Sequence, residues 1–134
     1  MSAVRQRNVA LILARELAVN VATPMWIWDE QGDLVYYNEH VQEILGSPER
    51  EIGVGRLEEL PQFEPCDLEG NPVDLSELPS AVALNQRVPA HRELRITGVD
   101  GVKRKIAVTA YPLMGRGGEF CGAVSVFWKL EDNG

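Results

Sequence analysis

The side chains that could carry out catalytic or metal-binding chemistry are dispersed along this chain. Its two histidines, His40 and His91, and its two cysteines, Cys66 and Cys121, lie far apart, and the cysteines form no C-x-x-C pair. A zinc site or a disulfide framework usually shows as closely spaced ligands. We therefore interpret the cysteines as two partly buried thiols in a reducing compartment and the histidines as surface residues.

Two pairs of acids, Glu58 with Glu59 and Glu49 with Glu51, could in principle transfer protons in an active site. A charged, solvated helix face explains them more simply. The sequence has no G-x-S-x-G, H-E-x-x-H or P-loop motif and no kinase, cyclase or phosphatase signature. We expect any enzymatic activity to belong to an attached domain or partner, and keep a small α+β enzyme with an acid–base pair in a pocket as an alternative.

Charge and hydropathy limit the possible partners. The 134 residues suit one domain, and 13 Lys and Arg against 20 Asp and Glu give a net charge of -7. Because the basic residues are scattered among acids, we expect no nucleic-acid partner. The longest unbroken apolar run, residues 9–14, is shorter than the roughly 18–20 residues that span a membrane. We expect a cytoplasmic protein without a membrane partner.

Strand-like runs of Val, Ile, Trp and Tyr would position any site. Residues 24–38, PMWIWDEQGDLVYYN, hold two such runs joined at an acidic glycine turn, which is typical of an antiparallel hairpin. We expect the Asn38 side chain to cap a helix over residues 39–45. Further strands are expected at residues 91–98, 103–113 and 119–128, with turns at Asp100-Gly101 and residues 115–118.

Helices precede and interrupt these strands. Apolar residues recur at four-residue spacing at Val9, Leu13 and Leu17, with Ile12 beside them. This spacing predicts an amphipathic helix at residues 4–21. Later in the chain we expect brief helical turns after Ser47 and at residues 57–60, a surface loop at 61–75, and a helix at 77–86 capped by Ser76. The predicted fold is α+β, a five-stranded antiparallel sheet with helices in the middle of the chain.

The order and spacing of these strands and helices resemble those of a PAS domain, the sensory and dimerisation module of signalling proteins. The likeness rests on Asp29 and Gly32, the LVYYN strand, the ILGSPEREIG and SELPSAVALNQ segments, and the closing strands RKIAVTAYPL and GAVSVFW. It implies strand order 2-1-5-4-3, a pocket between one face of the sheet and its helices, and the N-terminal helix on the other face. That helix often builds a homodimer, here through Val9, Ile12, Leu13 and Leu17.

Strand alternation then selects the side chains that would face this pocket. In PAS-like sequences the residues one and three before the acidic turn residue face it, here Trp28 and Trp26. The same alternation, together with the 77–86 helix, adds Leu34, Tyr36, Leu84, Leu94, Ile96, Ile106, Val108, Ser125 and Phe127. A shift of one residue would invert each set. Two indoles and a phenol would fill much of the volume, which favours a small ligand or none.

The resemblance also raises the question of haem and flavin. Haem needs an imidazole at the pocket wall, and the candidates His40 and His91 lie outside SELPSAVALNQ, where haem-binding relatives usually carry their histidine. Flavin photosensors of this fold use an Asn-Cys-Arg motif, which is absent, and Cys66 lies in PCDLEG. We predict no cofactor and no metal, and keep a haem- or flavin-binding sensor as an alternative.

The leading hypothesis is a cytoplasmic PAS-like sensory or protein-interaction domain in signal transduction, as in two-component systems and transcription regulation. Residues 1–22 would form the dimerisation helix, 23–130 the PAS-like domain, and 131–134 a tail leading to an output domain or partner. A small molecule or partner would shift the packing of the helix on the sheet. Trp128, facing away from the pocket, would contact the helix that follows.

Overall fold

The structure is a computed structural model that describes residues 11, 12, 14, 17 and 22–131. Its strands are β1 (Met25–Asp29), β2 (Leu34–Tyr37), β3 (Ala90–Thr97), β4 (Lys103–Met114) and β5 (Phe120–Lys129). Its helical segments are the α-helices α2 (Glu39–Ile44) and α3 (Pro79–Gln86) and the 3-10 helices η1 (Leu57–Phe63), η2 (Leu75–Glu77) and η3 (Arg116–Gly118). The predicted strands are all present, with small differences in their bounds.

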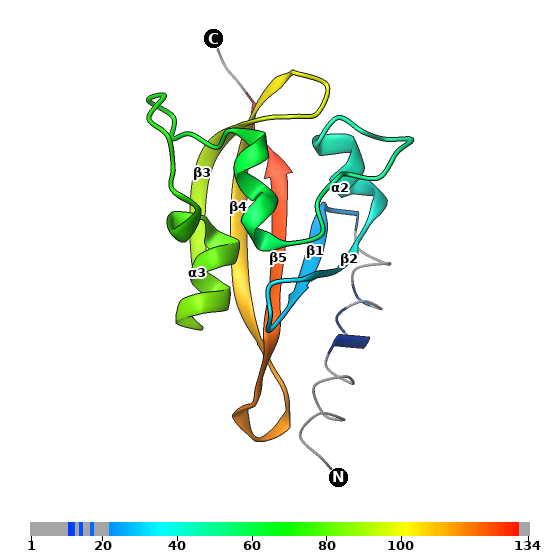
Figure 1. The fold of residues 1–134 in the computed structure, drawn as a ribbon, viewed down its shortest axis with the longest axis vertical. Helices are drawn as coiled ribbons and strands as arrows, with labels where there is room; N and C mark the ends of the chain where they lie inside the picture. The colour runs from blue at the N-terminus through cyan, green and yellow to red at the C-terminus, as the bar shows by residue number, and fades with distance from the viewer. Residues whose placement is uncertain (1–10, 13, 15–16, 18–21, 132–134) are drawn as a thin grey trace.

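The strands form one antiparallel sheet in the order β2-β1-β5-β4-β3, which confirms the predicted topology (Figure 1). The helices α3 and η1 lie across one face of this sheet, the inner face, and the main hydrophobic core fills the space between them. The opposite, outer face carries Met25 and Ile27 of β1. Two described helical residues, Leu11 and Ala14, pack there, so this part of the N-terminal helix lies on the predicted side.

A β-bulge in the first hairpin changes which residues of β2 face the core. Ile27 pairs with Tyr36, but Trp28 pairs with Leu34, so the register shifts by one residue between them. Leu34 and Tyr37 therefore pack against the inner core, while Tyr36 packs on the outer face. The prediction that Tyr36 lies on the pocket face is wrong, because simple alternation does not hold across a bulge.

Asn38 is buried at the start of α2, but its side chain makes no cap bond to that helix. Its Oδ1 accepts from the backbone N–H of Met25 at 3.2 Å, and its Nδ2 donates to the carbonyl oxygen of Thr23 at 2.8 Å. The predicted capping role is therefore wrong. Asn38 instead fixes the point where the chain enters β1, which positions the tryptophans that follow.

Two other predicted helix starts also differ from the structure. The Ser47 backbone N–H donates to the carbonyl of Gln42 at 2.8 Å, so this residue closes the end of α2, and only a turn follows it. Further on, the Asp74 carboxylate accepts from the Ser76 N–H at 3.1 Å and caps η2. The helix α3 then starts two residues later than expected, at Pro79, because proline suits a first helical turn.

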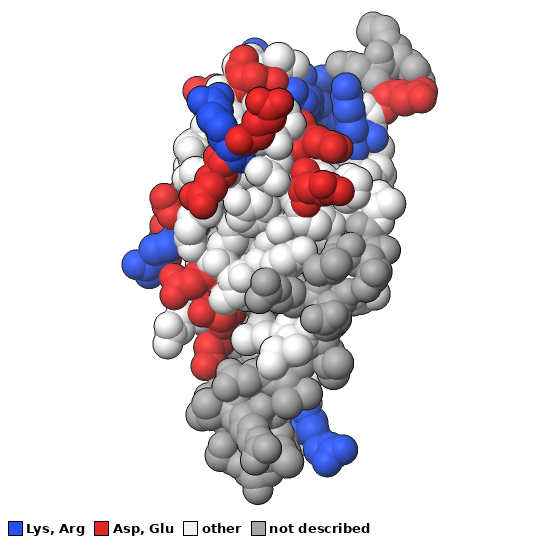
Figure 2. Space-filling model, turned by 90° about the vertical axis from the view of Figure 1, so that its right-hand side faces the viewer, with Lys and Arg blue, Asp and Glu red and all other residues white. Residues whose placement is uncertain are grey.

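Charged residues of both signs are mixed on the face shown in Figure 2, where lysine and arginine lie among aspartate and glutamate and a wide uncharged area lies below them. No basic patch is separated from the acids on this face. Among the described residues, no helix is both long enough and apolar enough to cross a membrane.

Replacing Asn38 with alanine tests its structural role. The Asn38→Ala variant should lose about 1–3 kcal/mol of unfolding free energy, because the Met25 N–H and the Thr23 carbonyl lose a partner where β1 begins. Urea unfolding measures this loss, with Glu39→Ala, an exposed neighbour, as the control. Equal midpoints for the two variants would contradict the role assigned to Asn38.

Candidate ligand pocket

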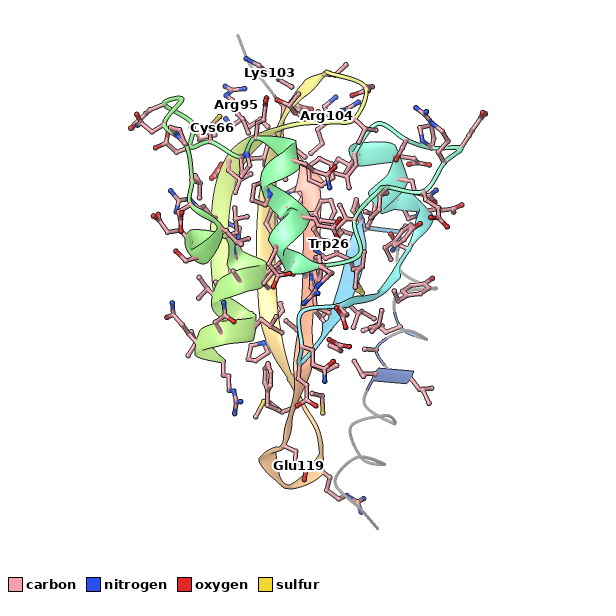
Figure 3. All side chains as sticks on the ribbon, viewed as in Figure 1. Trp26, Cys66, Arg95, Lys103, Arg104 and Glu119 are labelled. Carbon is pink, nitrogen blue, oxygen red and sulfur yellow. The ribbon has the colours of Figure 1, made fainter. Side chains whose placement is uncertain are left out.

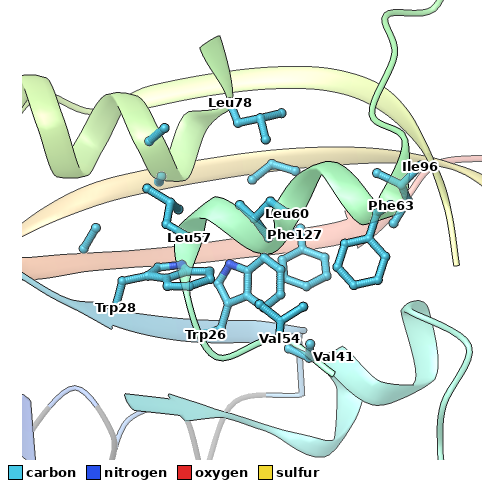
Figure 4. Packing of buried hydrophobic residues seen from close by; sticks show 14 of the residues in the cluster. Trp26, Trp28, Val41, Val54, Leu57, Leu60, Phe63, Leu78, Ile96 and Phe127 are labelled. Atoms are coloured by element: carbon cyan, nitrogen blue, oxygen red, sulfur yellow. The ribbon is translucent and has the colours of Figure 1, made fainter. Parts of the chain in front are cut away.

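An apolar cavity of about 50 Å³ lies between the inner face of the sheet and the η1 and α3 helices. Predicted pocket residues from four strands line it: Trp26, Leu94, Ile96, Ile106, Val108 and Phe127. Figure 4 shows Trp26 and Phe127 beneath η1, with Leu60 of that helix above them and the Phe63 ring beside Phe127. The strands therefore supply the floor of the cavity and the helical segments its roof.

The remaining predicted residues lie near this cavity or on the other face. Trp28, Leu84 and Leu34 belong to the inner core without lining the cavity. Ser125 is fully buried as the cross-strand neighbour of Trp26. Tyr36 lies on the outer face, as described above.

Strand alternation could not supply the residues of the cavity roof. They come from the end of α2, from η1 and from the segment leading into α3, and comprise Leu45, Leu60, Phe63, Pro65, Leu78, Pro79 and Ser80. None of these segments has a strand period. The apolar residues within the irregular 61–75 stretch, such as Phe63, were the available sequence signal.

Three aromatic rings from β1 and β5 pack together on the inner face beside the cavity. The ring centroids of Trp26 and Trp28 are 5.2 Å apart at an interplanar angle of 69°, and Phe127 lies 5.0 Å from Trp26. These are edge-to-face and tilted contacts, which aromatic pairs prefer. The rings hold one another in place beside the cavity.

The inner core contains few polar atoms. The indole N–H groups of Trp26 and Trp28 are buried and have no hydrogen-bond partner in the described part of the structure. The hydroxyls of Ser80 on α3 and Ser125 on β5 are 2.7 Å apart and share a hydrogen bond. This bond joins α3 to the centre of the sheet next to Trp26.

The β3–β4 turn is hydrogen-bonded to the end of α2, close to the cavity residues Leu45 and Ile96. The Val99 N–H donates to the Leu45 carbonyl at 2.9 Å. The guanidinium of Arg104 donates to both carboxylate oxygens of Asp100, at 3.0 and 2.7 Å (Figure 3 labels Arg104). These bonds from Arg104, followed by one from the Val102 N–H, lower the pKa of Asp100 to about 2.

Neither histidine lines the cavity. His91 lies on β3, with Nδ1 2.6 Å from the Thr109 hydroxyl and its ring 6.1 Å from that of Trp128. His40 is on α2, 3.6 Å from a carboxylate oxygen of Glu43. Among the described residues, no group of three or more His, Cys, Asp or Glu could hold a metal ion.

The acids and cysteines considered above are also outside the cavity wall. Glu59 accepts from the backbone N–H groups of Arg56 and Gly55, at 2.8 and 3.0 Å, and so caps η1. Cys66 is half-buried and exchanges backbone hydrogen bonds with Arg95 at the edge of β3, whereas Cys121 is buried on β5. No carboxylate lines this cavity in the described structure, whereas Glu30, Glu58 and Asp74 line a separate depression of about 420 Å³.

Comparison with known proteins identifies the family. The family model described as PAS fold matches residues 14–128, and the chain belongs to this family. Similar solved structures include the PAS domain of BvgS from Bordetella pertussis, with 17% identity, a TM-score of 0.62, and coverage of 92% of this chain and 87% of that one. A search of curated proteins finds no match.

Two further structural neighbours differ in their coverage. A variant of RsLOV has 16% identity and a TM-score of 0.70, with 100% of this chain and 71% of that chain covered. The phage VqmA–DPO complex has 17% identity and a TM-score of 0.59, with 98% of this chain but 57% of that chain covered. At these identities the likeness shows the shared fold.

The residues present do not fit haem or flavin. The cavity of about 50 Å³ is far smaller than the roughly 300–1,000 Å³ of typical ligand pockets. Trp26 and Phe127, whose ring centroids are 5.0 Å apart, both line the cavity, and no histidine lines its wall. The cavity in this structure therefore suits a much smaller molecule.

The serine pair allows a double-mutant test of the contact between α3 and the sheet. Ser80→Ala and Ser125→Ala should each destabilise the protein by about 1–3 kcal/mol, because each leaves the other hydroxyl buried without its partner. The double variant should lose less than the sum of the two, with a coupling energy of about 1 kcal/mol. Strict additivity in urea unfolding would show that the hydroxyls do not interact.

The low pKa of Asp100 predicts a pH dependence of stability. A carboxyl group whose pKa falls on folding stabilises the folded state above its ordinary pKa of 3.8 and loses that contribution as the pH falls toward about 2. The thermal midpoint of the parent should therefore exceed that of Asp100→Asn at about pH 6, and this difference should shrink on acidification. A difference that stays constant down to about pH 2 would contradict the assignment.

Proposed function

We propose that this chain is a cytoplasmic sensory domain in signal transduction, in which the cavity on the inner face controls packing on the outer face. The observation that carries the proposal is that β1 and β5 each contribute side chains both to the cavity and to the outer face of the sheet. On β1, Trp26 lines the cavity while its neighbour Ile27 packs outward. On β5, Phe127 lines the cavity while Val126 packs outward.

Coupling between the faces follows from this alternation. Leu11 and Ala14 pack against the outer cluster of Met25 and Ile27, which Val126 of β5 also contacts, so a shift of β1 or β5 would change the surface beneath the N-terminal helix. An occupant that favours one arrangement of the strands would therefore shift the population of helix positions. The neighbour VqmA was solved in complex with DPO, which supports a ligand in this fold.

The exposed side of the N-terminal helix supports a homodimer. Ile12 is 58% and Leu17 59% exposed, while Leu11 and Ala14 pack toward the sheet. Covering these exposed apolar side chains with a second copy would remove them from water. Val9 and Leu13, predicted at the same interface, lie outside the described residues.

The far end of β5 would pass the signal to an output domain or partner protein, as in two-component or transcriptional regulators. Trp128 is 39% exposed and lies against His91, away from the cavity. A segment that follows residue 130 would pack on this indole. Residues 1–22 would then be the dimerisation helix and 23–130 the sensory domain.

The dimer is tested by placing charge on the exposed helix side. The parent should show the mass of a dimer in light scattering, and the Ile12→Asp/Leu17→Asp variant should show the mass of a monomer, because two carboxylates cannot be buried cheaply. Val102→Asp, at another exposed apolar residue, should remain dimeric. A monomeric parent, or a double variant that stays dimeric, would rule out this interface.

Coupling between the faces is tested by filling part of the cavity. Val108→Ile adds a methyl group at the cavity wall and should change amide hydrogen exchange in a peptide covering residues 11–17 by at least about two-fold. Val102→Ile adds the same group at an exposed site and should leave the peptide unchanged. If Val108→Ile behaves like this control, the two faces are not coupled and the sensory proposal fails.

A further inference from the structure

A second depression lies at the edge of the sheet, where β3 ends and β4 begins. Its volume is about 180 Å³, and it is lined by Glu64, Cys66, Arg95, Ile96, Thr97 and Lys103. Figure 3 shows the labelled Cys66, Arg95 and Lys103 at the same end of the molecule. The depression shares only Ile96 with the inner cavity, so it is a separate candidate site.

Backbone pairing brings the polar side chains of this depression to one face of the sheet. Cys66 and Arg95 exchange two backbone hydrogen bonds, of 3.0 and 2.8 Å, so they lie directly opposite each other with their side chains on the same face. Thr97 is two positions further along β3 and therefore on that face, and Lys103 is its cross-strand partner. The register thus gathers a guanidinium, a hydroxyl and an ammonium group as neighbours.

The acid that lines the depression does not neutralise these cations. Glu64 forms no ion pair with another residue of the described structure, and neither does Lys103. Lys105 lies opposite Arg95 in the register and so adds positive charge on the same face. Three basic side chains therefore face one carboxylate here, in a chain whose net charge is -7.

The donors and the volume define the chemistry of a ligand. A guanidinium presents parallel N–H donors that match phosphate and carboxylate oxygens, while an ammonium group acts as a compact charge and a hydroxyl adds one more donor. Two cations attract a dianion more strongly than a monoanion. A depression of about 180 Å³ is several times the roughly 30 Å³ that one water occupies in the liquid, so a small oxyanion has room to enter.

We propose that this depression binds a small dianionic oxyanion of the phosphate class, held by Arg95 and Lys103 with the Thr97 hydroxyl as a further donor. The site goes beyond the proposed sensory cavity and does not depend on that cavity being occupied. Glu64 weakens the attraction, so its carboxylate limits the affinity of the site.

Titration of inorganic phosphate into ¹⁵N-labelled full chain tests the site, with the backbone N–H signals of Cys66, Thr97 and Lys103 followed by NMR. The titration is run at about pH 7.5, where phosphate is mostly a dianion, and potassium chloride keeps the ionic strength constant. The shifts should saturate in the millimolar range, and acetate, a monoanion, should bind at least about three-fold more weakly. Shifts that rise without saturation, or equal affinity for acetate, would overturn the proposal.

Charge-matched variants locate the binding. Arg95→Gln/Lys103→Gln should lose the saturable shifts, whereas Arg50→Gln/Arg116→Gln removes the same charge at exposed residues outside the depression and should bind phosphate like the parent. Equal binding by these two double variants would show an effect of net charge alone and overturn the site.

Two single variants give the same test with less disturbance of the fold. Lys103→Gln, at an exposed residue, should weaken phosphate binding at least about three-fold. Glu64→Gln, which removes the opposing carboxylate, should strengthen it at least about two-fold. Unchanged affinity in both variants would contradict the assigned ligands, and the hydrogen-exchange test of coupling decides the sensory proposal separately.

Discussion

The packing of Trp26, Trp28 and Phe127 on the inner face is the constraint on which the rest of this structure depends. Both indoles are almost completely buried. A ring of this size buries 150–250 Å², which corresponds to a stabilisation of about 4–6 kcal/mol each as an upper estimate. The η1 helix must cover these rings, and this requirement explains why an irregular segment between α2 and α3 carries the buried residues Leu57, Leu60 and Phe63.

The large rings on one side of the inner face are matched by small residues on the other. Ala81 and Ala83 of α3 are fully buried, and the sheet presents Ala110 and Ser125 among its buried residues. Small side chains let α3 approach the sheet, and the Ser80–Ser125 hydrogen bond joins the two layers there. The cavity lies between these regions, so its volume is set by the aromatic rings and by the position of α3 together.

The sequence predicted the sheet well because its strands are long and follow the alternation that burial imposes. For β1, β3, β4 and β5 this alternation places Trp26, Leu94, Ile96, Val108 and Phe127 correctly on the inner face. It failed for Tyr36, because a bulge in a four-residue edge strand leaves no periodic signal. Asparagine is a common helix cap, but the side chain of Asn38 bonds to Met25 at the start of β1 and to Thr23 just before it, 13 and 15 positions away.

The roof of the cavity was beyond sequence reasoning for a related physical reason. Leu60 and Pro65 come from segments that have no strand period, and tertiary packing decides which of their side chains turn inward, whereas Leu78 and Ser80 lie at the start of α3. The sequence pattern predicted only one member of the buried serine pair. Alternation placed Ser125 on the inner face, whereas its partner Ser80 lies 45 residues earlier on a different layer.

The two indoles and Phe127 leave room on the inner face for a small molecule and nothing larger. X-ray diffraction from a crystal held under xenon pressure tests it most directly, because xenon enters small apolar cavities without needing hydrogen bonds. We expect a xenon peak in the cavity between Trp26, Leu78 and Phe127. A structure in which this site stays empty under xenon, or in which the indoles lie on the outer face beside a much larger pocket, would contradict it.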